Sequence, residues 1–236
     1  MKKFIVMMSL FSFACVLNAQ TEKWEYPIKP GSQEWRMTSY AYKVEKSQPP
    51  KEILNKWDTG TLFEYCMNYP FNLVTWMYND PNFGFKHVYE QSSVWQEFVR
   101  RKDAVDVLVK YFETFSFERL YEIEEAYIRG IEAHKLYFLE KVVSKTDFTA
   151  YLDVAGKRKL ANTILQTHLS KQNFPDRIYG YRYNSSLCAL IKILESDLSN
   201  GELSLTKLRE TTRDEYFVDA GMDEAIITKV FNYINR

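Results

Sequence analysis

Apolar residues recur every three or four positions along most of the chain, which is the spacing of one face of an α-helix. Leu62, Cys66 and Tyr69 follow this spacing, and Phe85 and Val88 begin a second run of the same kind. No segment alternates apolar and polar residues over the length that a strand requires. The pattern therefore predicts an all-α fold.

Capping residues and prolines mark where the predicted helices begin. A side chain such as Asp or Ser at the N-cap accepts a hydrogen bond from a backbone N–H of the first turn, and proline's fixed φ suits the first helical position. Asp80-Pro81 combines the two signals. Further predicted starts are Ser32, the group Asp58, Thr59 and Thr61 with the capping box Thr61–Glu64, Pro70, the capping box Ser93–Gln96, Asp103, Thr146 and Asn184.

These starts and spacings predict about eleven short-to-medium helices in an irregular layered bundle or a short α-solenoid-like array. Predicted helices cover residues 32–46 and 157–171, and one long helix is predicted over residues 117–143. We expect one all-α domain over residues 32–236, with a subdivision near residue 115 as the alternative. Residues 20–31 contain two prolines and a glycine, so we expect them to form an extended leader.

The N-terminus has the pattern of a secretory signal peptide. Two lysines precede an apolar run at residues 4–17 that is too short to span a bilayer. Ala19 supplies the small residue that signal peptidase needs, so we expect cleavage of residues 1–19 and a mature chain that begins at Gln20. Lipid attachment at Cys15 is the alternative. Either way the protein is expected to be exported, to the periplasm or beyond, without a membrane span.

Five short motifs carry a resemblance that covers residues 25–115. In order they are KPGSQEW (29–35), EIL (52–54), NYPF (68–71), NFGF (82–85) and RRKDA (100–104). In these motifs the chain resembles a group of secreted proteins of anaerobic Gram-negative gut bacteria. The resemblance implies an exported leader and an all-helical domain. That group has no assigned activity, so the resemblance implies no catalytic residue.

Charge and cofactor motifs exclude several functions. The chain has 31 basic and 31 acidic residues and a formal net charge of +0, so it lacks the basic balance of a nucleic-acid-binding protein. Its three histidines, His87, His134 and His168, fall on separate predicted helices. No HExxH, CxxC or glycine-rich phosphate loop occurs, so we expect no metal site and no cofactor.

Two cysteines, Cys66 and Cys188, remain after the predicted cleavage. Both lie on apolar helix faces, so we interpret them as buried free thiols. Pairing in an oxidising compartment is the alternative. A catalytic role for Cys66 is disfavoured because a nucleophilic thiol needs a partly exposed, electropositive setting.

Glu124 is the candidate catalytic residue. It falls within about 40° of the centre of an apolar face of the long predicted helix, near Leu120 and Phe138. A carboxylate on such a face is costly unless it is paired, and perturbed carboxylates mark functional sites. The alternative is that Glu124 lies at the edge of this face or pairs with a basic residue of a neighbouring helix.

A tyrosine-rich loop is the candidate ligand-binding site. Its aromatic and guanidinium groups could form a platform for a glycan or peptide, or they could anchor a long loop onto the helices. The candidate residues are Phe174, Arg177, Tyr179, Tyr181, Arg182 and Tyr183.

These observations favour an exported, non-enzymatic binding protein whose partner is an unknown protein, peptide or glycan. The alternative is a glycan- or cell-wall-directed hydrolase or lyase that uses carboxylates such as Glu124, which needs two acidic groups across a cleft. A chaperone-like or structural role in the periplasm is a third hypothesis.

Overall fold

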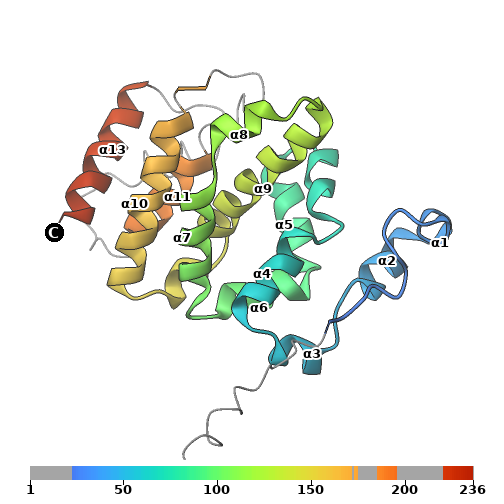
Figure 1. Ribbon diagram of the computed structural model, residues 1–236. Helices are drawn as coiled ribbons and strands as arrows, with labels where there is room; N and C mark the ends of the chain where they lie inside the picture. Colours follow the sequence, from blue (N-terminus) through green and yellow to red (C-terminus); the bar gives the residue numbers. More distant parts are fainter. Residues whose placement is uncertain (1–22, 172, 175–184, 196–219, 236) are drawn as a thin grey trace, which may run out of the picture.

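The computed structural model describes residues 23–171, 173–174, 185–195 and 220–235. Within these residues it has twelve α-helices, two 3₁₀-helices and no strand (Figure 1). The predicted all-α fold is confirmed.

The helices are short to medium in length, and those from α1 to α10 are joined by short turns. Residues 23–32 precede the first of them and form no helix. In chain order the elements are α1 (Gln33–Met37), α2 (Tyr40–Lys46), α3 (Lys51–Lys56), α4 (Thr59–Met67), η1 (Asn72–Met77), α5 (Pro81–Glu90), α6 (Ser93–Arg100), α7 (Ala104–Thr114), α8 (Phe117–Glu122), α9 (Ala126–Lys145), η2 (Phe148–Tyr151), α10 (Val154–Lys171), α11 (Ser185–Glu195) and α13 (Ala220–Ile234).

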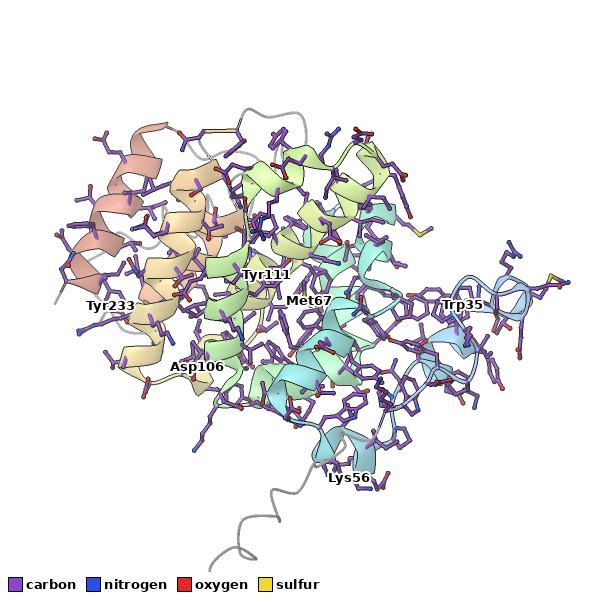
Figure 2. The ribbon with its side chains drawn as sticks, viewed as in Figure 1. Trp35, Lys56, Met67, Asp106, Tyr111 and Tyr233 are labelled. Carbon is purple, nitrogen blue, oxygen red and sulfur yellow. The ribbon has the colours of Figure 1, made fainter. Side chains whose placement is uncertain are left out.

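The longer helices form a layered body, and α1 and α2 project from one side of it (Figure 1). Helix α11 packs against α9 and α10, and α10 also packs against α7 and α13. One hydrophobic cluster extends through the body from Leu54 to Tyr233. Figure 2 shows side chains filling the space between these helices.

Aromatic rings attach the projecting segment to the body. Helices α1 and α2 have no buried residue of their own. The rings of Trp35 and Tyr40 lie 5.5 and 5.3 Å from the ring of Phe71. Edge and tilted contacts of this kind each contribute about 0.5–1.5 kcal/mol beyond area burial.

A glycine allows α5 and η1 to approach closely. A Cβ atom on Gly84 would lie 2.6 Å from the carbonyl oxygen of Thr75, which is well inside van der Waals contact. Any larger residue at this position would push α5 away from η1.

Several predicted helix starts are confirmed. The Ser32 side chain accepts a hydrogen bond from the backbone N–H of Trp35 at 3.1 Å. The Asp80 carboxylate accepts one from the backbone N–H of Asn82 at 2.8 Å, and Pro81 is the first residue of α5.

At α4 the predicted start is confirmed, but the cap is Asp58 and not the Thr61–Glu64 box. Two other predicted starts are wrong. Ser92, not Ser93, caps α6. Pro70 lies in the turn before η1 instead of in its first turn.

Two of the predicted helices are interrupted. The segment 32–46 forms α1 and α2, because Ser39 leaves the helical conformation and caps α2. The segment 117–143 is broken after Glu122, where Ile123 adopts an extended conformation. Arg129 donates a hydrogen bond to the Ile123 carbonyl at 3.2 Å, and the Ile123 side chain packs against the core. The turn therefore allows the Ile123 side chain to pack against the core, whereas a continuous helix would point it in another direction.

Candidate functional site

Glu124 is not on an apolar helix face. It lies in the turn between α8 and α9, and its side chain is exposed. Tyr127, three residues further along the chain, is 67% exposed. The placement that made Glu124 a catalytic candidate is therefore wrong, because the long helix on which it depended is broken. Its catalytic role stays a prediction, and the apolar surroundings on which that prediction rested are absent around this exposed side chain.

One of the six candidate ligand residues is described. Phe174 is half-buried, and its ring lies 5.7 Å from Phe117 and 5.2 Å from Tyr121, close to parallel with both. The other five, Arg177, Tyr179, Tyr181, Arg182 and Tyr183, lie outside the described residues.

The two cysteines are free and buried, as predicted. Burial raises the pKa of the Cys66 thiol well above its ordinary value, and burial also raises that of Cys188. A raised pKa keeps a thiol protonated and weakly nucleophilic.

In the part of the chain that the structure describes, no group of three or more His, Cys, Asp or Glu side chains is arranged to hold a metal ion. None of the described helices is long and apolar enough to cross a membrane.

A groove of about 300 Å³ lies between α7, α8 and α10, and we call it the α7–α10 groove. It is lined by Phe112, Glu113, Phe115, Phe117, Glu118, Asn162, Thr163, Gln166, Thr167 and Ser170.

The floor of the α7–α10 groove is aromatic and hydroxylic. Phe112 and Phe117 are buried and Phe115 is half-buried. The hydroxyls of Thr163 and Thr167 donate to carbonyls of their own helix at 2.9 and 3.0 Å. A hydroxyl oxygen that donates can still accept a hydrogen bond. The floor thus offers apolar surface and two acceptors.

The rim of the groove is exposed and polar. Glu113 and Glu118 stand on the side of α7 and α8, and Asn162 and Gln166 stand one turn apart on α10. The Glu118 carboxylate accepts a hydrogen bond from the Ser116 hydroxyl at 2.8 Å. Its pKa is lowered by its own backbone N–H and then by this hydroxyl. The carboxylate is therefore ionised and partly oriented.

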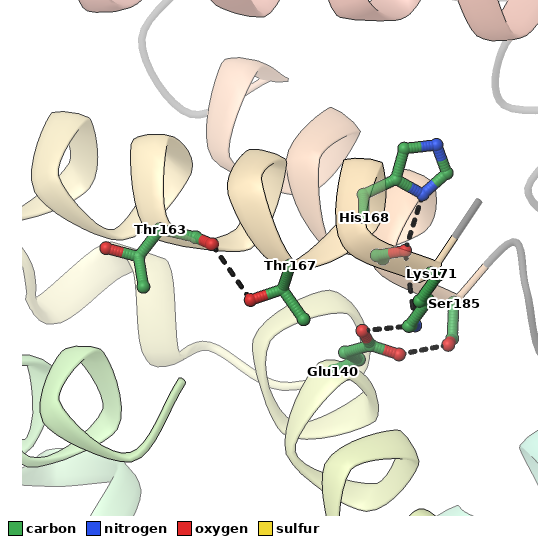
Figure 3. A network of polar contacts seen from close by, with 7 residues as sticks. Glu140, Thr163, Thr167, His168, Lys171 and Ser185 are labelled. Carbon is green, nitrogen blue, oxygen red and sulfur yellow. Dashed lines mark hydrogen bonds and ion pairs between the residues drawn. The ribbon is translucent and has the colours of Figure 1, made fainter. Parts of the chain in front are cut away.

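A second polar feature lies next to the groove, at the C-terminal end of α10, where Lys171 follows Thr167 by one helical turn. We call it the Glu140–Lys171 cluster, and it also contains His168, Ser185 and Ser186 (Figure 3). The Lys171 ammonium is 2.5 Å from one Glu140 oxygen, and the Ser185 hydroxyl donates to the other. The Ser186 oxygen lies 2.9 Å from the Nδ1 atom of His168 and 3.3 Å from the Lys171 nitrogen.

All five members of the Glu140–Lys171 cluster are buried. Burial raises the pKa of Glu140 and lowers the pKa of Lys171, while the contact between the two opposes both shifts. Buried charges are tolerated only when paired and hydrogen-bonded, and this pair has both. We interpret the cluster as a structural centre that joins α9, α10 and α11.

Comparison of the chain with protein-family models, with curated proteins and with solved structures finds no match. The site must therefore be interpreted from its own geometry.

Sequence reasoning missed both features. The α7–α10 groove combines residues that are about 50 positions apart, and no spacing rule brings them together. Glu140 and Lys141 do carry a signal, because they interrupt the apolar run at residues 136–143. Two adjacent charges inside such a run predict buried ionised groups that need partners.

Proposed function

We propose that the protein is an exported, non-enzymatic binding protein and that the α7–α10 groove holds part of a protein, peptide or glycan. The observation that carries this proposal is the groove itself, with an aromatic floor beneath a rim of hydrogen-bonding groups. Its volume is at the lower end of ordinary ligand sites, which range from about 300 to 1,000 Å³. It suits one side chain or one sugar ring of a larger partner.

The groove is built from rigid parts. Its walls come from packed helices, and α10 makes one of the larger helix contacts of the fold with α7. Asn162 and Gln166 are exposed on α10, and each amide offers donors and an acceptor. A preformed apolar floor with a few polar groups is the usual design of a binding site.

The geometry supports the enzyme alternative less well. A glycan- or cell-wall-directed hydrolase needs one carboxyl group whose pKa is raised, so that it can donate a proton. Glu113 and Glu118 are the carboxylates of the groove, but the pKa of Glu118 is lowered. Glu118 therefore does not suit the role of general acid, and a hydrolase would have to use another carboxyl group as the proton donor. Binding needs no such group and is the simpler proposal.

Export rests on the N-terminal sequence. The basic start, the short apolar run and Ala19 support a mature chain that begins at Gln20. Intact mass of exported protein is the test. A mass that still includes residues 1–19, or a lipid on Cys15, would reject simple signal cleavage.

The binding proposal is tested with peptide and glycan libraries and a variant that removes both rim amides, Asn162→Ala with Gln166→Ala. Loss of two hydrogen bonds of about 1 kcal/mol each predicts at least about tenfold weaker binding. Asn55→Ala is the control, since Asn55 is an exposed amide on α3, outside the groove. Isothermal titration calorimetry measures each affinity.

Two results would contradict the binding proposal. The first is that no library member binds more weakly to the double variant than to the control. The second is that a retained glycan is cleaved, which would favour the hydrolase.

A further inference from the structure

We infer that the α7–α10 groove receives a basic side chain, lysine or arginine, from a peptide segment of another exported protein. This inference rests on the proposed function and narrows its ligand to one chemical class.

The charge of the lining is the first reason. Glu113 and Glu118 contribute two negative charges, and none of the lining residues in the described part of the chain is basic. The whole chain has a formal net charge of +0, so this negative charge is a local feature and not a property of the entire surface. An anionic ligand would be repelled from this rim.

Lys159, a basic residue of α10 close to Asn162 in the sequence, does not cancel this charge. The Lys159 ammonium lies 2.8 Å from a carboxylate oxygen of Asp106, and Glu113 acts on Lys159 only as an additional, more distant charge. Lys159 is itself outside the lining. The two rim carboxylates remain available to an incoming cation.

The second reason is that the groove has apolar surface inside and charged groups at its rim. Lysine and arginine carry a charged head on an apolar stem. In the groove, the half-buried ring of Phe115 is the aromatic surface open to a ligand, while Phe112 and Phe117 are buried, and the carboxylates stand at the exposed rim. A stem that lies on the Phe115 ring places its head beside the rim, where an aromatic face also attracts a cation.

The third reason is the state of the Glu118 carboxylate. The hydrogen bond from Ser116 holds one oxygen at 2.8 Å, yet a carboxylate offers about four lone-pair positions. It can therefore accept from a guanidinium or ammonium without losing its present partner. Such charge-assisted bonds are shorter and stronger than neutral ones.

The amides of Asn162 and Gln166 favour a peptide over an isolated cation. They stand opposite the carboxylates and can bond the main-chain N–H and C=O groups that flank a basic residue. A free polyamine would leave them to water. A peptide uses both sides of the groove.

The experiment titrates the mature protein with acetyl-Gly-Arg-Gly-amide, followed by NMR shift changes or calorimetry. The same peptide with citrulline is the matched neutral probe, since it replaces the guanidinium by a urea group of the same shape. We expect the arginine peptide to bind at least about tenfold more tightly, and its binding to weaken as salt rises, because exposed charges are screened.

Charge-removing variants locate the effect. Glu113→Gln with Glu118→Gln should abolish the preference for arginine over citrulline and most of the salt dependence. Glu122→Gln is the control, because Glu122 is an exposed glutamate on α8 that does not line the groove. It should bind the arginine peptide as the parent protein does.

The outcomes separate this inference from the proposed function. If the citrulline peptide or a neutral glycan binds as well as the arginine peptide, and the Asn162/Gln166 variant weakens that binding, the groove is a binding site but not for basic side chains. If spermidine binds and the arginine peptide does not, a free organic cation replaces the peptide and the inference fails. If no peptide, glycan or cation binds, both proposals fail together.

Discussion

Helix α10 takes part in two polar regions, and they differ in burial. Its exposed residues Asn162 and Gln166 line the α7–α10 groove, where the carboxylates on the opposite wall are also exposed. Its last turn supplies His168 and Lys171 to the Glu140–Lys171 cluster, where every side chain is buried (Figure 3). Charged groups that lie close to the same helix are thus in opposite environments.

This difference shows how burial assigns a role to a charge. An exposed ion pair contributes about 0–1 kcal/mol to folding, so exposed carboxylates can be kept for a ligand at little cost. A buried ion pair contributes little net stability as a pair, but loss of one partner leaves an uncompensated charge and costs about 3–5 kcal/mol. Variants of the groove rim should therefore affect ligand binding, and variants of the Glu140–Lys171 cluster should affect stability.

The largest effect is expected from Lys171→Met. It removes the ammonium that lies 2.5 Å from Glu140 and leaves a buried carboxylate with the Ser185 hydroxyl. We expect the free energy of unfolding to fall by about 3–5 kcal/mol, measured by urea denaturation. The double variant Lys171→Met with Glu140→Gln should recover a large part of that loss. A loss below about 1 kcal/mol for Lys171→Met would show that the cluster is solvated.

Lys141 offers a test of the buried side at different pH values. Its side chain is fully buried, and its ammonium donates to Asn82 at 2.7 Å and lies 5.3 Å from the centre of the Tyr137 ring. Burial, and then the nearby Lys145, lower the pKa of Lys141 to about 7, although Cys188, Asp80 and Glu140 act in the opposite direction.

The sign of the pH dependence follows from this pKa. Between about pH 7 and the ordinary value of 10.5, the unfolded chain binds the Lys141 proton and the folded chain does not. Stability from this group therefore rises with pH across that window, and its full cost is present below pH 7.

The test compares Lys141→Met with the parent protein by urea denaturation at pH 6, 8 and 9.5. We expect the variant to gain stability relative to the parent at pH 6, on the order of 2 kcal/mol, and to lose this advantage as pH rises. Taking the difference between the two proteins removes the titration of all other groups. An advantage that is equal at all three pH values would show that Lys141 does not titrate in this range.

The helix starts could be predicted because an N-cap is a local interaction. Ser32 and Asp80 each bond a backbone N–H two or three residues further along the chain, so their role is written in a few adjacent letters. The break after Glu122 could not be predicted in this way. Apolar spacing continues across it, and the contacts that favour the turn come from Arg129 and from core packing around Ile123.

The candidate site depended on tertiary contacts to a greater extent. Glu140 and Lys171 are 31 positions apart, and their contact follows from the packing of α9, α10 and α11. The Glu124 prediction assumed one continuous helix over residues 117–143. It was wrong because the helix is broken after Glu122. Phe174 became a candidate because its segment is rich in aromatic residues. Its ring contacts Phe117, which lines the groove, and nothing in the sequence indicated this contact.

The smallest effect on stability is expected at the exposed rim of the α7–α10 groove. Glu113→Gln keeps the shape of a rim side chain that is exposed and outside the hydrophobic cluster. Surface substitutions of this kind usually change the free energy of unfolding by less than about 0.5 kcal/mol. Denaturation midpoints of this variant and of Lys171→Met, measured at one pH, compare the groove rim and the buried cluster in the same units. If Glu113→Gln destabilised the protein as strongly as Lys171→Met does, the rim carboxylate would belong to the fold. The groove would then lose half of the charge on which its preference for a basic side chain depends.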